Sequence, residues 1–130
     1  MLIADANDRM RLLLRSTLSD LDAEILEART SESALECVRT HRPEWVMLEF
    51  NLRPLNGLVV AQTIRGEFPT AKIVMVTNCD DPEVKAQAQA IGVMSYILKD
   101  DLLEVRKLIR SAGRQPPPAR SNHGATGFPT

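Results

Sequence analysis

The chain has 130 residues, of which 44% are hydrophobic and 25% are charged, and its formal net charge is −1. This length and composition are typical of one globular domain, and the near-neutral charge predicts no general attraction to nucleic acid or to an anionic membrane. No apolar run approaches the roughly 20 residues that span a bilayer, and the N-terminus lacks a signal-peptide pattern. We therefore expect a cytoplasmic protein, in which the cysteines, Cys37 and Cys79, are reduced and form no metal site.

Five short apolar segments alternate with five helix-like patterns along the chain. The segments cover residues 1–5, 23–28, 45–50, 71–76 and 93–99. The first, third and fourth are almost continuously apolar, which is typical of parallel strands that are covered on both faces. The second and fifth include polar residues, which indicates strands at the edges of a sheet.

Each helix-like pattern has recognisable ends. The residues that can cap the N-termini are Asn7 or Asp8, Thr30 or Ser31, Asn56, Asp81, and Asp100 or Asp101. The C-terminal ends of the second to fifth helices are marked by Pro43, Pro69, Gly92 and Gly113. The apolar stripe predicted for the first helix is Met10, Leu13, Leu14, Leu18 and Leu21.

This alternation predicts right-handed βαβ units and a parallel sheet. Five such units within residues 1–113 indicate an α/β, flavodoxin-like, doubly wound fold with strand order 2-1-3-4-5 and five helices. Residues 114–130 are rich in proline, glycine and serine and have no apolar period. They are therefore predicted to form a tail or linker after a single domain.

Polar side chains end four of the predicted strands. Asp5, Glu49, Thr77 and Lys99 all fall at the carboxyl ends, where open α/β sheets bind their ligands. Each residue alone also fits an ordinary role, such as helix capping or a solvated strand end, but the four together favour a site. The chain contains no glycine-rich phosphate-binding motif, so a nucleotide cofactor is not indicated.

Nearly all of the predicted domain resembles the receiver domain of two-component response regulators. The spacing from Glu49 to Gly57 is similar to that from the family's phosphoacceptor to its glycine. Thr77 is similar to the switch hydroxyl at the end of the fourth strand. The segment "GVMSYILKD" resembles the one that carries the family's switch aromatic residue and lysine, here Tyr96 and Lys99. It is most similar to receivers that precede a helix-turn-helix domain.

The resemblance implies an aspartate that accepts a phosphoryl group, and a Mg²⁺ ion held by two acids, that aspartate and a nearby carbonyl. This chain has Glu49 in place of the aspartate, Ala6 in place of the second acid, and Arg53 in place of a loop proline. The remaining candidates for metal binding are Asp5, Glu49 and the carbonyl of Asn51. We expect no metal and no cofactor, because these substitutions weaken the donor set.

The sequence therefore predicts an atypical receiver that is not an enzyme and is not switched by phosphorylation. Glutamate extends the carboxylate by about 1.5 Å, a C–C bond, which brings Lys99 and Thr77 within its reach, and an inward Tyr96 would indicate an active-like state. The expected partners are proteins, including a second copy, at the surface of the fourth helix, fifth strand and fifth helix. Two alternatives stay open: a phosphorylatable receiver with a tolerant Mg²⁺ site, and the N-terminal regulatory domain of a helix-turn-helix DNA-binding transcriptional regulator.

Overall fold

The computed structural model describes residues 1–114, which form a five-stranded parallel sheet between two layers of helices. The strands are β1 (Leu2–Ala4), β2 (Leu26–Ala28), β3 (Trp45–Leu48), β4 (Lys72–Thr77) and β5 (Ser95–Leu98). The helices are α1 (Asp8–Thr17), α2 (Ser31–His41), α3 (Gly57–Glu67), α4 (Pro82–Ile91) and α5 (Leu103–Arg114).

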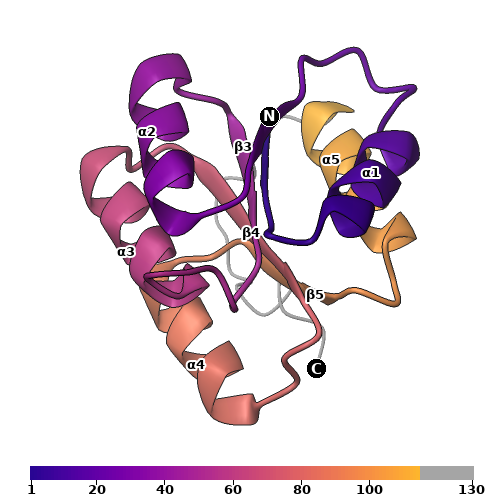
Figure 1. The fold of residues 1–130 in the computed structure, drawn as a ribbon. Coiled ribbons are helices and arrows are strands. Elements are labelled where there is room, and N and C mark those ends of the chain that lie inside the picture. The colour runs from indigo at the N-terminus through magenta and orange to yellow at the C-terminus, as the bar shows by residue number, and fades with distance from the viewer. Residues whose placement is uncertain (115–130) are drawn as a thin grey trace.

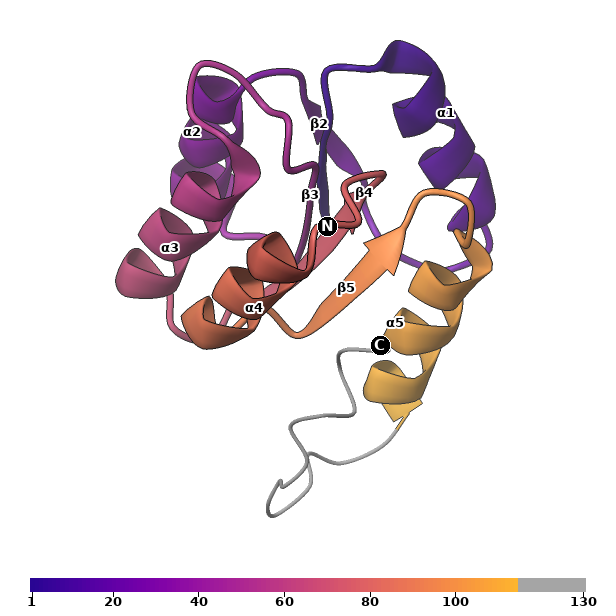
Figure 2. The same cartoon turned by 90° about the horizontal axis from the view of Figure 1, so that it is seen from below.

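The strand order is β2-β1-β3-β4-β5, and every neighbouring pair is parallel. The predicted flavodoxin-like fold is therefore confirmed, with the more polar strands β2 and β5 at the two edges. Helices α2, α3 and α4 cover one face of the sheet, and α1 and α5 cover the other (Figures 1 and 2). This arrangement gives a hydrophobic core on each face, and β3 and β4 contribute buried side chains to both cores.

Local capping explains where four of the helices begin. Side-chain oxygens of Asn7, Thr30, Asn56 and Asp81 accept hydrogen bonds from the first backbone N–H groups of α1, α2, α3 and α4. These bonds satisfy donors that have no partner inside the helix. Gly92 follows α4 with a φ of 100°, a conformation that glycine adopts without steric strain.

Helix α1 differs from the prediction in its buried face. Leu14 and Leu18 are buried, but Leu13 is 42% exposed, so its place in the predicted stripe is wrong. The helix ends at Thr17, which leaves Leu21 in the segment that follows. Arg11 is buried instead, because its guanidinium meets polar partners beneath the helix.

The end of the described chain lies close to the predicted domain boundary. Helix α5 continues one residue past Gly113, and residues 115–130 of the predicted tail lie outside the described residues. Within residues 1–114, no helix is long and apolar enough to cross a bilayer.

Candidate functional site

Four polar side chains meet at the carboxyl edge of the sheet, where β1, β3, β4 and β5 end. They belong to Asp5, Glu49, Thr77 and Lys99. Asp5, Glu49 and Thr77 are only 4%, 5% and 0% exposed. Because charged groups are costly to remove from water unless they are paired, their contacts decide how this cluster is stabilised.

The ammonium group of Lys99 lies between the two carboxylates. Its Nζ atom is 2.6 Å from Oε1 of Glu49 and 2.8 Å from Oδ2 of Asp5. Burial by itself lowers the pKa of Lys99, but hydrogen bonds and charge from Asp5 and Glu49 outweigh it, so the net shift of the pKa is upward. Lys99 therefore stays protonated and bridges both acids.

The remaining oxygen atoms of the two carboxylates also have partners. Oε2 of Glu49 accepts a hydrogen bond from the hydroxyl of Thr77, and it accepts another from the backbone N–H of Asn51 at 2.9 Å. Oδ1 of Asp5 accepts from the backbone N–H of Asn7 at 2.9 Å. All four carboxylate oxygens are thus bonded within the protein, which is how buried anions are retained at tolerable cost.

A chain of hydrogen bonds connects Glu49 with Tyr96. The hydroxyl of Thr77, which donates to Glu49, lies 3.2 Å from the backbone N–H of Cys79 and accepts from it. The carbonyl of Cys79 accepts from the Tyr96 hydroxyl at 2.6 Å. Tyr96 is 3% exposed, and burial raises its pKa, so the phenol stays a hydrogen-bond donor.

The loop after β3 is fixed by close packing against Gly57 and by hydrogen bonds with Ser31. Gly57 lies so close to the loop that an added Cβ would sit 2.4 Å from the carbonyl oxygen of Glu49. Ser31, at the start of α2, donates its N–H to the Arg53 carbonyl at 2.9 Å and accepts at Oγ from the Leu55 N–H at 3.0 Å. These contacts hold the backbone that carries Glu49.

The sequence reasoning did not identify Arg11 as part of this region. Its guanidinium donates to the carbonyl of Asp5 at 2.5 Å and to Oε1 of Glu27 at 2.8 Å, and it also pairs with Asp8. Helix α1 contains three arginines, Arg9, Arg11 and Arg15, and arginines usually lie on the exposed face, so nothing in the sequence singles out Arg11. The partners on β2 and on the β1–α1 loop are visible only in the folded chain.

Comparison with known proteins decides the family. The sequence model of the protein family described as "response regulator receiver domain" matches residues 1–110 of the chain. The chain belongs to the response regulator receiver family. The transcriptional regulatory protein LnrK of Bacillus subtilis is 28% identical over 124 residues, which are 90% of this chain and 56% of LnrK.

The chain is also similar to a solved receiver domain and to part of a protein named as an enzyme. The crystal structure of the NtrX receiver domain from Brucella abortus is 26% identical with a TM-score of 0.73, covering 82% of this chain and 94% of that one. A protein-glutamate methylesterase/protein-glutamine glutaminase of Natronomonas pharaonis is 27% identical over 99 residues, 75% of this chain and 28% of that protein. The chain spans about half or less of the curated relatives it matches.

The receiver resemblance implies Mg²⁺, but the residues present fit it poorly. Mg²⁺ prefers about six oxygen ligands in a regular octahedron. Ala6 offers no side-chain ligand, and the oxygens of Asp5 and Glu49 that face the site are bonded to Lys99. Within residues 1–114, no three His, Cys, Asp or Glu side chains are grouped so that they could hold a metal ion.

Proposed function

We propose that this receiver takes part in signal transduction through protein–protein contacts and is not switched by phosphorylation. The observation that carries the proposal is that both carboxylate oxygens of Glu49 already have partners at the site. One of its oxygens meets Lys99 at 2.6 Å, and the other accepts from Thr77. In the family these two residues grip a phosphoryl group, so the glutamate carboxylate takes its place.

The geometry disfavours phosphoryl transfer to Glu49. A nucleophilic carboxylate needs an oxygen that can approach phosphorus, and both oxygens of Glu49 are hydrogen-bonded within the site. The carboxylate also lies one C–C bond beyond the position of an aspartate, about 1.5 Å, and a misplacement of about 1 Å can cost 100-fold in rate. Ala6 removes part of the donor set that would neutralise the transferred group.

We infer that the receiver rests in an active-like state. In the family the aromatic switch residue turns inward when the hydroxyl grips the phosphoryl group. Here Tyr96 is buried and is linked through Cys79 to Thr77 and Glu49. The α4–β5–α5 surface would then be permanently ready for a protein partner in the cytoplasm, without catalysis by this domain.

Intact mass spectrometry after incubation with acetyl phosphate and Mg²⁺ tests the proposal. We expect no added phosphoryl group on the wild-type protein. The Glu49→Asp/Ala6→Asp variant, which restores both acids, is the positive control and should gain one group. Stoichiometric modification of the wild type at Glu49 would refute the proposal and favour the alternative of a tolerant, phosphorylatable site.

A second candidate function is regulation of transcription by a longer protein. LnrK is a transcriptional regulatory protein, and the chain matches 56% of it. A helix-turn-helix domain after residues 114–130 would make that segment a linker, and DNA binding would belong to the added domain. The full open reading frame tests this: a stop codon directly after Thr130 would exclude it.

A further inference from the structure

A pocket of about 320 Å³ opens between α4, β5 and the start of α5. This volume is at the low end of the range of about 300–1,000 Å³ for small-molecule sites, so it suits one or two side chains better than a large cofactor. Tyr96 and Leu98 of β5 line the pocket with apolar side-chain surface. The pocket thus has an apolar floor on the same strand as the residue coupled to Glu49.

The rim of this pocket carries four carboxylates, and two of them are already paired. Asp80 lies 2.6 Å from the ammonium of Lys85, and Glu104 lies 3.2 Å from that of Lys107. The Lys85 ammonium is also 5.8 Å from the centre of the Tyr96 ring. The internal cations therefore neutralise only part of the rim.

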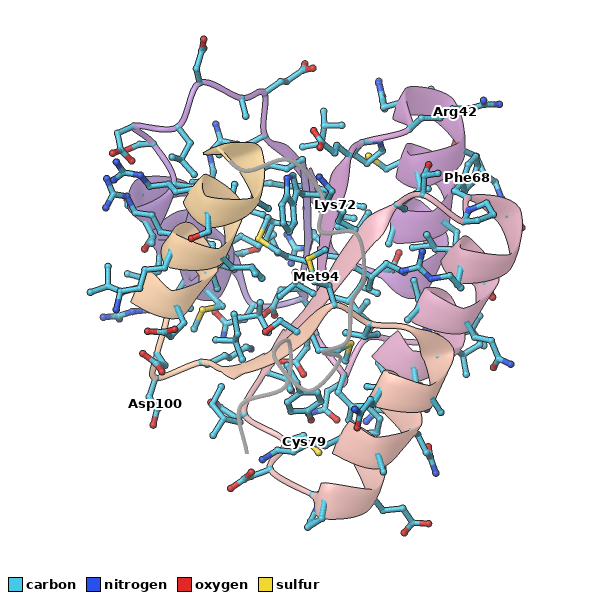
Figure 3. The ribbon with its side chains drawn as sticks, turned by 180° about the vertical axis from the view of Figure 1, so that it is seen from behind. Arg42, Phe68, Lys72, Cys79, Met94 and Asp100 are labelled. Atoms are coloured by element: carbon cyan, nitrogen blue, oxygen red, sulfur yellow. The ribbon has the colours of Figure 1, made fainter. Side chains whose placement is uncertain are left out.

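The other two carboxylates belong to Asp100 and Asp101 in the turn between β5 and α5. Both residues are exposed, and neither forms a salt bridge within the described part of the chain. Figure 3 shows Asp100 in this turn and Cys79 in the loop that leads into α4. The rim consequently presents uncompensated negative charge next to an apolar floor.

We propose that this pocket receives an arginine side chain from an apolar, cationic segment of a partner protein. Arginine suits the site because its planar guanidinium presents several donors to neighbouring carboxylates, and its stem can pack along Leu98 and Tyr96. The same charge repels phosphate groups, which disfavours a nucleic acid at this surface. The proposal rests on the proposed function, because it supplies the chemistry of the partner at that surface.

Fluorescence anisotropy with a short fluorescein-labelled peptide of arginine, leucine and alanine tests the pocket. The Asp100→Asn/Asp101→Asn variant removes the uncompensated charge, and asparagine still caps helices, so α5 should form. The Asp22→Asn/Glu24→Gln variant makes the same change of charge in the exposed loop between α1 and β2. It is the matched control.

We expect the pocket variant to bind the peptide about 10-fold more weakly, as for the loss of a charge-assisted contact at an interface, and the control variant less than about twofold more weakly. A peptide with citrulline in place of arginine should bind the wild type more weakly. Its affinity should be the same for the wild type and the pocket variant. Equal weakening in both variants would show non-specific attraction and overturn the proposal.

Two further measurements separate the remaining outcomes. If light scattering shows that the wild type dimerises and the pocket variant does not, the occupant is a second copy and the partner proposal is overturned. If pocket-specific binding strengthens after acetyl phosphate and Mg²⁺, the arginine pocket stands while the proposed phosphorylation-independent function fails. Binding that depends on the pocket and ignores the phosphodonor supports both.

Discussion

Replacement of Lys99 by methionine should destabilise the folded domain strongly. Methionine keeps an unbranched stem but removes the ammonium that lies 2.6 Å from Glu49 and 2.8 Å from Asp5. Both carboxylates would remain in residues that are 5% and 4% exposed. Leaving a buried charge without its partner costs about 3–5 kcal/mol.

The lower end of that range applies here. The Lys99 side chain retains 11% exposure, so water screens the cluster in part. We therefore expect a loss of about 3 kcal/mol, a large share of the 5–15 kcal/mol by which domains are usually stable. With an m-value of about 1.5 kcal/mol per molar urea, the unfolding midpoint should fall by about 2 M.

Urea unfolding followed by far-ultraviolet circular dichroism at pH 7 measures this loss. EDTA in the buffer prevents a divalent cation from replacing the missing ammonium. Lys107→Met is the matched control, because that side chain is 71% exposed and its contact with Glu104 lies at the surface. The control should stay within about 0.5 kcal/mol of the wild type.

Two results would refute the reasoning. A Lys99→Met variant within about 1 kcal/mol of the wild type would mean that the carboxylates are not held by the ammonium. An equal loss in Lys107→Met would mean that the assay reports a general effect of removing positive charge.

Three further predictions concern the same site. Glu49→Asp/Ala6→Asp should bind Mg²⁺ with measurable heat in titration calorimetry while the wild type does not, and equal heats would contradict our view of the donor set. Gly57→Ala should lower the free energy of unfolding in urea by about 1–3 kcal/mol, because the added Cβ would sit 2.4 Å from the Glu49 carbonyl oxygen. Gly66→Ala is the control, because an added Cβ in α3 would meet nothing within 4 Å, and it should raise the free energy of unfolding by about 0.5–1 kcal/mol. Similar effects at both positions would contradict the role of crowding at Gly57. Because Lys99 has a raised pKa in the folded state despite burial, its stabilisation should be full below the pKa of unfolded lysine and lost as pH rises through the folded value; unfolding at alkaline pH measures this, and an unchanged difference between wild type and Lys99→Met across that range would contradict it.

The elements that depend on neighbouring residues were predictable from the sequence. Helix capping by Asn7, Thr30, Asn56 and Asp81 involves only backbone groups two or three residues away, so the caps could be read directly. The alternation of strands and helices likewise predicted the parallel sheet, because parallel strands need crossover connections. The polar residues in the second and fifth strands predicted which strands lie at the edges.

The buried face of α1 was not predictable in the same way. Three consecutive leucines, Leu12, Leu13 and Leu14, fit more than one helical stripe, and only Leu14 is buried. Arg11 takes an inward position because Glu27 on β2 and the carbonyl of Asp5 lie beneath it. Those partners come from other elements, so periodicity within the helix could not reveal them.

For the site, the sequence by itself determined which chemical groups end the strands, and it showed that Ala6 and Glu49 stand in place of two aspartate-type acids of the family. The direction of the Glu49 carboxylate was decided only by the tertiary structure. Its partners, Lys99 and Thr77, end strands that are 50 and 28 residues away. Contacts across such separations depend on how β3, β4 and β5 pair and twist, and on the room that Gly57 leaves for the loop.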